Sequence, residues 1–291
     1  MKAGGFVKPG CQIKFGSLDV PYPFGIILEW KKGPNCSMDN WFGITCNSST
    51  NLPKAFFHHS NIEIFDISDT KLRIGNYMAE RCYNQSGYIY RATDPFINLG
   101  GTSTFSDANV LTVVGCNDYG NIYQAKDDLL PKGYNTTCHN AEEVLKHKCS
   151  GTGCCQVSVN VHKYFDISLN SYDNHTSNMS YSPCGYAFYG EKNAFKFGGF
   201  SDLNDTAFVN KTIATIPIVL DWVIAENITC AQASQDSKSY ACRYNNSQCI
   251  DIKPGRIFGG YRCSCKQGNE GNPYLSPGSK DKLVVVLAIA D

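Results

Sequence analysis

The 291-residue chain contains 15 cysteines, and their thiols are the groups most able to do chemistry in it. Thiols form disulfides, ligate metals or act as nucleophiles, and here they are spread along most of the chain instead of standing in one short motif. Cysteine at this density indicates disulfides formed in an oxidising compartment. Because the number is odd, at least one thiol must lack a partner within the chain.

Zinc is the alternative use for a cysteine cluster, and His147, Cys149, Cys154 and Cys155 stand close together in the sequence. Their spacing matches no standard zinc finger, and adjacent cysteines are common in disulfide frameworks. A calcium site would need several acidic residues beside Cys230, where the chain offers only Glu226. We therefore expect no metal site and no cofactor.

Sequons of the form Asn-x-Ser/Thr are interleaved with the cysteines, and each marks a surface position that can carry a glycan. The ten sequons begin at Asn35, Asn47, Asn84, Asn135, Asn174, Asn178, Asn204, Asn210, Asn227 and Asn245. A cytosolic metalloprotein would explain the thiols but not the sequons. The two features together predict an extracellular or cell-surface glycoprotein.

Catalytic signatures are missing from the sequence. It contains neither Gly-x-Ser-x-Gly nor His-Glu-x-x-His, and no pair of acids stands out as the two carboxylates that a glycosidase requires. The formal net charge is zero, which provides no general attraction to nucleic acid. We expect a binding protein that is not an enzyme and has no nucleic-acid partner.

The elements that must position these groups are mainly strands. Alternating or β-branched runs predict strands at residues 62–67, 110–114, 157–161 and 213–220, separated by turn-forming clusters. One short helix is expected at residues 141–148, with Asn140 as its cap and Glu143 in its first turn. The predicted fold class is mostly β and disulfide-rich.

Three modules are expected along the chain: residues 11–118, residues 119–228 and residues 229–281. The first two are rich in strand signals, and the third is Gly- and turn-rich with five cysteines spaced as in an EGF-like module. Such a module is too small for a core and depends on its bridges. Its segment 230–282 carries eight basic and four acidic residues, which is interpreted as a solvated face.

The two ends differ from the rest. Residues 1–8 lack the apolar run of a signal peptide, and the apolar residues 283–290 are too few to span a membrane. We interpret the tail as a truncated membrane segment. A truncated or decayed gene copy is the hypothesis that explains both ends.

Seven motifs in order carry a family resemblance. They are Val20-Pro21-Tyr22-Pro23-Phe24-Gly25-Ile26, Val113-Val114-Gly115-Cys116-Asn117, Cys149-Ser150-Gly151-Thr152-Gly153-Cys154-Cys155-Gln156, Cys184-Gly185-Tyr186-Ala187-Phe188, Val219-Leu220-Asp221-Trp222, Tyr240-Ala241-Cys242 and Gly260-Tyr261-Arg262-Cys263-Ser264-Cys265, the last followed by Gly271-Asn272-Pro273-Tyr274-Leu275. Over residues 11–281 the chain resembles the extracellular region of plant wall-associated receptor kinases. The resemblance implies a galacturonan-binding domain, the adjoining wall-associated-kinase domain and an EGF-like repeat. The kinase motifs themselves are absent from the sequence.

Three departures from the family pattern affect the cysteines. Phe15 stands where a second cysteine belongs, none follows Cys138 before Cys149, and Ser279 replaces the last cysteine of the EGF-like repeat. Cys11, Cys138 and Cys265 are therefore expected to be unpaired. The disulfide candidates are Cys36, Cys46, Cys82, Cys116, Cys149, Cys154, Cys155, Cys184, Cys230, Cys242, Cys249 and Cys263. In the EGF-like repeat the resemblance implies the pairs Cys230–Cys249 and Cys242–Cys263; elsewhere the pairing is open.

Galacturonan, the ligand that the resemblance implies, carries one carboxylate per sugar. Its binding calls for Arg or Lys donors and for aromatic rings that pack on sugar faces. The candidates are Lys31, Lys32, Lys71, Arg73, Arg81, Arg91, Tyr88 and Tyr90. Strand alternation would place Lys71 and Arg73 on one face. The competing interpretation is that these are scattered surface charges.

Two aromatic motifs are interpreted as structural. Residues 20–26 predict a rigid turn with a buried aromatic corner, and Trp222 is expected in the core. The predicted function is binding of pectin or oligogalacturonides at the surface or in the wall of a plant cell, without a signalling output of its own. The alternatives are a protein-interaction module that binds a partner membrane receptor or a peptide, and a decayed gene copy.

Overall fold

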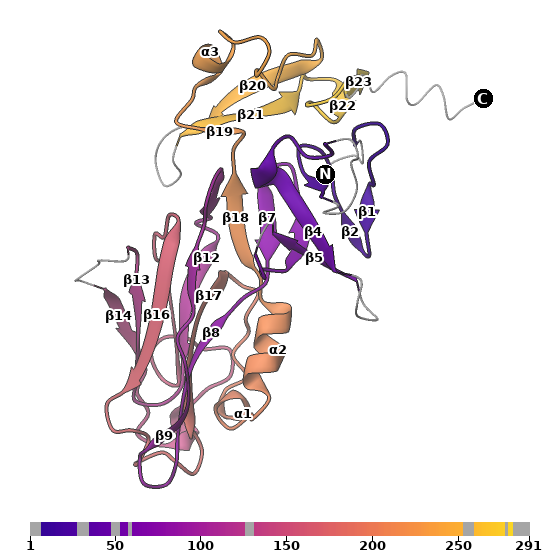
Figure 1. The fold of residues 1–291 in the computed structure, drawn as a ribbon. Coiled ribbons are helices and arrows are strands. Elements are labelled where there is room, and N and C mark those ends of the chain that lie inside the picture. The colour runs from indigo at the N-terminus through magenta and orange to yellow at the C-terminus, as the bar shows by residue number, and fades with distance from the viewer. Residues whose placement is uncertain are drawn as a thin grey trace. The chain divides into compact units, whose positions relative to one another are not determined.

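The computed structural model describes residues 7–27, 35–47, 53–57, 60–125, 131–252, 259–276 and 279–281. Strands dominate and the helices are short (Figure 1). The mostly β, disulfide-rich fold class is therefore confirmed. No helix in the described part of the chain is long and apolar enough to cross a membrane.

The chain divides into two compact units whose segments interleave along the sequence. The first unit comprises Met1–Ile74, Gly100–Thr104 and Leu220–Asp291, and the second comprises Gly75–Leu99 and Phe105–Val219. These units are defined by packing, and each combines segments from different parts of the chain. They therefore do not test the three consecutive modules expected from the sequence, which remain a prediction.

The first unit is built from small sheets. Its amino-terminal strands are β1 (Lys14–Phe15), β2 (Leu18–Asp19), β3 (Gly25–Ile26), β4 (Gly43–Asn47), β5 (Lys54–Phe57), β6 (Ile64–Ile67) and β7 (Lys71–Ile74), with the 3-10 helix η1 (Asn40–Phe42) before β4. Strands β3, β4 and β5 form one sheet, and β6 and β7 form another with β18 (Ile218–Trp222) and β11 (Ser103–Phe105). The strand predicted at residues 62–67 is found as β6.

The predicted aromatic corner is confirmed. Tyr22 and Phe24 are buried on either side of a cis Tyr22–Pro23 peptide bond. The ring of Phe24 meets Phe42 at 5.2 Å and Trp222 at 5.3 Å, both edge to face. Trp222 is only 2% exposed, so it belongs to the core as expected.

The C-terminal segment completes the first unit. It contains β19 (Ala225–Glu226), α3 (Cys230–Ala233), β20 (Ser247–Ile252), β21 (Gly260–Cys265), β22 (Asn269–Gly271) and β23 (Ser279–Asp281). Thr229 and Gln232 form a capping box at the start of α3. Asn272 Nδ2 donates to Tyr22 O at 2.5 Å, which joins this segment to the aromatic corner.

The second unit contains two larger antiparallel sheets. Its strands are β8 (Met78–Tyr83), β9 (Ile89–Thr93), β10 (Phe96–Asn98), β12 (Asn109–Val114), β13 (Asp118–Tyr123), β14 (Lys132–Asn135), β15 (Cys154–Val157), β16 (Tyr164–Ser171) and β17 (Cys184–Glu191). The five-stranded sheet has the order β15-β12-β17-β8-β9, and the four-stranded sheet has the order β10-β16-β13-β14.

The core of the second unit lies between these sheets. On β16, Phe165, Ile167 and Leu169 alternate with half-exposed residues and are fully buried, as expected of a strand with one face covered. The Phe165 ring packs against Tyr189 of β17 at 5.6 Å. On the other face of the five-stranded sheet, α1 (Phe200–Leu203) and α2 (Phe208–Thr215) contribute to an apolar cluster, in which Phe208 meets Tyr186 at 4.6 Å.

Two local predictions were wrong. The helix expected at residues 141–148 is only the 3-10 turn η2 (Ala141–Glu143), although Asn140 caps it as predicted. The backbone extends at Val144 because its side chain is drawn into the apolar cluster. Residues 213–220 are not one strand: α2 continues to Thr215, and β18 begins only after Pro217. Tertiary packing overrides the local propensity in both places.

A third prediction holds only in part. The alternation at residues 157–161 belongs to a strand only at its start, because β15 ends at Val157. Val159 and Val161 are nevertheless buried, so the apolar pattern predicts burial correctly. The strand predicted at residues 110–114 is found as β12.

Six disulfides link the described cysteines. They are Cys11–Cys36, Cys82–Cys184, Cys116–Cys138, Cys149–Cys154, Cys230–Cys249 and Cys242–Cys263. The last two are the pairs that the EGF-like resemblance implied. Cys265 is not in a disulfide, and its thiol lies 3.4 Å from Gly271 O.

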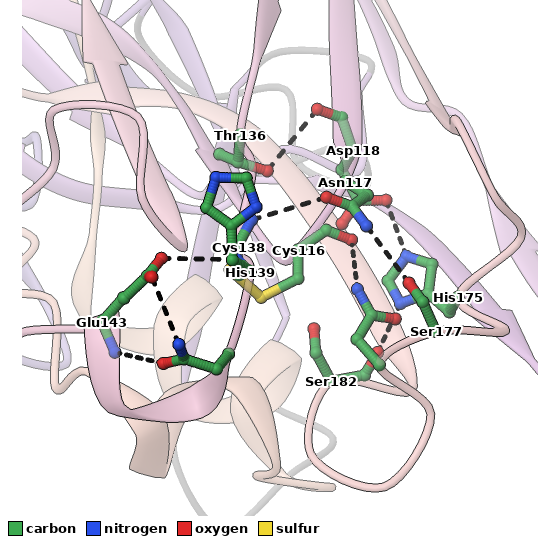
Figure 2. Close-up of a disulfide and its surroundings, with 12 residues drawn as sticks. Cys116, Asn117, Asp118, Thr136, Cys138, His139, Glu143, His175, Ser177 and Ser182 are labelled. Atoms are coloured by element: carbon green, nitrogen blue, oxygen red, sulfur yellow. Dashed lines mark hydrogen bonds and ion pairs between the residues drawn. A yellow bond between two sulfur atoms is a disulfide. The ribbon is translucent and has the colours of Figure 1, made fainter.

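Four cysteine expectations need correction. Cys11 is bonded to Cys36 because Lys8 Nζ anchors the preceding residues to the carbonyls of Asn35 and Ser37. Cys138 is bonded to Cys116 (Figure 2). Its backbone N–H donates to Asn117 Oδ1, a contact between residues 21 positions apart that holds Cys138 beside Cys116.

Cys46 and Cys155 were expected in disulfides and instead carry thiols in the described structure. Neighbouring residues of a strand point to opposite faces, so Cys149 can reach Cys154 but not Cys155 on β15. The bond between Cys149 and Cys154 also removes two thiolates from the zinc ligand set considered above.

Candidate ligand-binding site

A cavity of about 520 Å³ opens in the first unit. Its walls come from the aromatic corner, the β6–β7 loop, β18, β21 and the loop after β22. The lining residues used below are Tyr22, Asp69, Trp222, Arg262, Glu270 and Tyr274. This volume is within the range of small-ligand sites in proteins.

Aromatic rings form one wall of the cavity and hydrogen bonds hold them in place. Tyr274 lies edge-on to Tyr22 at 6.5 Å and tilted against Trp222 at 6.3 Å. Trp222 Nε1 donates to Ser68 O at 3.2 Å, and Tyr274 Oη accepts from Cys263 N at 3.0 Å. The wall is therefore formed before any ligand arrives.

Arg262 supplies the positive charge of the cavity. Strand alternation on β21 buries Tyr261 and Cys263 and turns Arg262 to the other face. Its Nη1 donates to Thr70 O at 3.0 Å, and the guanidinium lies 6.0 Å from the Trp222 ring centre. None of the ion pairs found among the described residues includes Arg262, so N–H donors remain for an acidic ligand.

Burial shifts the pKa values of two charged groups that line this cavity, Arg262 and Asp69. It lowers the pKa of Arg262, and the nearby Tyr274, Asp221 and Asp69 act in the opposite direction. Burial also raises the pKa of Asp69, against the effect of Arg262. The cavity thus combines one guanidinium with the carboxyl groups of Asp69 and Glu270. That set suits a ligand with a single acidic group and several hydroxyls, because the carboxyl groups can accept hydrogen bonds from hydroxyls.

Two of the sequence-predicted cations lie on β7 in the first unit. Lys71 and Arg73 are half-exposed on one face of the strand, while Leu72 between them is buried, as alternation predicted. Lys71 Nζ lies 2.6 Å from Asp221 Oδ1, and Arg73 Nη1 lies 3.2 Å from Asp66 Oδ2. Their charges are already neutralised within the fold.

The other described candidates lie on the β8–β9 hairpin of the second unit. Arg81 pairs with Asp94 at 2.5 Å, and Arg91 pairs with Glu80 at 3.1 Å. Tyr88 and Tyr90 are exposed. Lys31 and Lys32 lie outside the described residues. The described candidates are therefore divided between the two units.

Arg262 is not among the ligand-binding residues predicted from the sequence, because the excess of basic residues in segment 230–282 is interpreted there as a solvated face. The signal that could have identified it is its position between Tyr261 and the disulfide-forming Cys263, because two inward-pointing neighbours on a strand turn the residue between them to the opposite face. Asp69 and Tyr274 had no comparable signal, because their role depends on segments far apart in sequence.

The sequons fall into two groups by exposure. Nine of the ten asparagines are exposed: Asn35, Asn47, Asn84, Asn135, Asn174, Asn204, Asn210, Asn227 and Asn245. Asn178 is only 1% exposed, and its Nδ2 donates to Cys116 O at 2.8 Å. A glycan at Asn178 is incompatible with this fold, because the nitrogen that would carry the sugar is buried and bonded.

A buried ion pair lies beside the Cys116–Cys138 disulfide in the second unit (Figure 2). Asp118 and His175 are fully buried, with Asp118 Oδ1 at 2.8 Å from His175 Nε2. His175 Nδ1 makes a second hydrogen bond to Ser182 O. Both functional groups are sealed from ligand, so we assign the pair a role in stability and not in binding.

The chain is similar to wall-associated receptor kinase 2 of Arabidopsis thaliana, with 33% identity over 279 residues, covering 93% of the chain and 34% of that protein. Wall-associated receptor kinases 5 and 1 of the same plant are each 31% identical and cover 94% of the chain and 35% of their own length. The chain thus spans about a third of the length of these relatives. No family model and no solved structure matches it.

Proposed function

The chain is a homologue of the wall-associated receptor kinases over nearly its whole length, and we propose that it binds acidic wall polysaccharide, namely de-esterified pectin or oligogalacturonides. We place this activity at the cell surface or in the cell wall, where the names of the relatives point. The candidate binding site is the cavity of the first unit, with Arg262 as its acidic-group receptor.

The availability of Arg262 is the observation that carries the proposal. The described candidates Lys71, Arg73, Arg81 and Arg91 are each held by a carboxylate, so an acidic sugar would have to displace that partner. Arg262 holds a backbone carbonyl instead and keeps further donors in its planar fork. A uronate carboxylate fits such a fork, and the aromatic wall fits a sugar ring.

The charge of the cavity limits how much of a polymer it can hold. A single guanidinium beside two carboxyl groups favours one uronate residue over a run of them, because a second carboxylate would meet Asp69 or Glu270. We therefore expect binding to weaken only moderately as salt rises, since one charged contact is screened.

The test is binding of size-graded oligogalacturonides to the intact, secreted and glycosylated chain at low and moderate salt. Arg262→Gln should weaken binding by about 10- to 100-fold, the size of a lost hydrogen bond to a charged group. The matched control is Arg73→Gln, which removes an equal charge from the ion-paired strand β7 of the same unit and should leave binding unchanged.

Each result has a distinct meaning. If Arg73→Gln abolishes binding and Arg262→Gln does not, the acidic sugar is read by β7 and the cavity assignment is wrong. If the folded chain binds no oligogalacturonide at all, the pectin proposal fails. A partner that remains bound in excess polygalacturonate would identify a protein-interaction module instead.

A further inference from the structure

The outer face of the four-stranded sheet in the second unit carries aromatic and amide side chains. Buried residues on β13 and β16 alternate with half-exposed ones, so the half-exposed set points away from the core. Strand register then defines rows across this face. One row joins Asn135 of β14, Tyr119 of β13 and Asn170 of β16, because each residue is directly opposite the next.

Tyr172 extends this row into a platform. Its ring lies 4.9 Å from that of Tyr119, at an interplanar angle of 37°. Tyr172 directly follows β16 and is 63% exposed. An aromatic pair with one exposed and one half-exposed ring, beside amide groups, is suited to a sugar, whose ring faces are apolar and whose edges carry hydroxyls.

The charge of this face excludes the acidic polymer proposed for the first unit. The outward residues of β13 and β16 are Tyr119, Asn121, Tyr123, Tyr164, Asp166, Ser168 and Asn170. They include one acid and no base, and burial raises the pKa of that acid, Asp166, with Asp94 adding to the effect. A polyanion finds no cationic partner here, so the occupant must be an uncharged, hydroxyl-rich group.

The chain supplies such a group at Asn135. This residue begins the sequon Asn135-Thr136-Thr137, is exposed, and makes no side-chain hydrogen bond to the described residues. Thr136 beside it is fully buried, which turns Asn135 outward on the same side as Tyr119. Side chains directly opposite in an antiparallel pair have Cβ atoms about 5 Å apart, so a sugar on Asn135 starts at the Tyr119 ring.

We propose that an N-linked glycan on Asn135 packs its first sugars on the Tyr119–Tyr172 pair, with Asn170 as a hydrogen-bonding partner. Crossing from β14 to β16 covers two strand spacings, or about 10 Å, which is comparable with the disaccharide that begins an N-glycan. The packed glycan would cover the outer faces of β14 and β13. This inference is independent of the pectin proposal.

The test is a double-mutant cycle on the intact secreted chain, with site occupancy first measured by mass spectrometry. Denaturant unfolding is compared for the native chain, Asn135→Gln, Tyr172→Ser and the double variant. Removing the glycan should lower the folding equilibrium constant about fivefold when Tyr172 is present and not at all in the Tyr172→Ser background. Tyr172→Phe keeps the ring and should retain the effect.

Two further measurements separate packing from other roles of the tyrosines. In nuclear magnetic resonance spectra, ring currents should move the proton signals of the first sugar upfield, and Tyr172→Ser should return them. Asn174→Gln removes a nearby exposed sequon and should leave the coupling unchanged. Three results would overturn the inference: no glycan on Asn135, sugar proton signals that are not shifted, or equal effects of Tyr172→Ser with and without the glycan. Binding of a free neutral oligosaccharide to the unglycosylated face would then identify another occupant.

Discussion

Replacing His175 with alanine should destabilise the second unit more than any surface substitution. The change leaves the carboxylate of Asp118 fully buried and without its partner at 2.8 Å. The other oxygen, Oδ2, already has no hydrogen-bond partner among the described residues, so nothing nearby can take over. The Asp118 carboxylate packs directly against Gly185 and fills the space that a side chain there would occupy: a Cβ at that position would lie only 2.5 Å from Oδ1. The carboxylate therefore has no room to move away in that direction.

The expected magnitude follows from the burial of both groups. Removing one member of a buried ion pair costs about 3–5 kcal/mol, because the remaining charge stays desolvated. The control is Asp205→Asn, which breaks the Lys211–Asp205 pair at 2.6 Å on the surface of the same unit. Exposed pairs contribute at most about 1 kcal/mol, so the control should change little.

The pair should also make the free energy of unfolding depend on pH. Burial raises the pKa of Asp118, and the opposing hydrogen bond and charge of His175 do not cancel this. Burial lowers the pKa of His175, but the hydrogen bond and charge of Asp118 outweigh it and the net shift is upward. Both folded-state pKa values lie above the unfolded ones, so stability is present at acidic pH and is lost as pH rises through the folded values.

The assay is urea unfolding of the intact chain at a series of pH values between about 4 and 8, where unperturbed Asp and His titrate. The native chain should lose stability as pH rises, and the double variant Asp118→Asn/His175→Gln should give a flatter profile. The groups in contact that could also contribute are Tyr83, stacked on His175, and Asp173. A loss below about 1 kcal/mol in His175→Ala, or stability that increases with pH, would refute this reasoning.

Two further predictions concern covalent chemistry. Replacing Cys82 and Cys184 by serine removes a disulfide between residues 102 positions apart and should lower the free energy of unfolding by about 4 kcal/mol. The control is Cys155→Ser, at a thiol outside any disulfide, which should have little effect. Unfolding curves of the secreted variants measure both changes. Mass spectrometry of the folded, secreted chain should find a glycan on Asn174 but none on Asn178, and substantial occupancy of Asn178 would show that the buried bond to Cys116 is not formed.

Much of the fold class could be predicted from the sequence because it depends on side-chain type and short spacing. The density of cysteines predicts a disulfide framework wherever it folds, and the Pro-Tyr-Pro turn predicts a buried corner because proline restricts the backbone locally. The pairs Cys230–Cys249 and Cys242–Cys263 are those that the resemblance to an EGF-like module implied. Alternation on β7 predicted that Lys71 and Arg73 share one face, and Leu72 between them is buried.

Long-range contacts decided what the sequence left open or predicted wrongly. The partner of Cys138 depends on a hydrogen bond to Asn117, and the early end of η2 depends on Val144 entering a cluster built from distant strands. The same limit applies to the candidate site. One ion pair of the cations predicted from the sequence is of this kind: the Lys71–Asp221 pair joins residues 150 positions apart and neutralises the lysine.

The sequence by itself therefore determined that the protein is rich in disulfides and strands and where its local turns lie, because each of these depends on residue types or on residues near one another in the chain. Only the tertiary structure decided which cations remain available, which thiols are bonded and which sequon is buried. These properties depend on the distance between side chains and on their access to solvent, and both arise when separate segments pack together. Arg262 illustrates the difference. Strand alternation determines which way its side chain points, whereas its contacts with Thr70 in the β6–β7 loop and with Trp222 place it in the lining of the cavity.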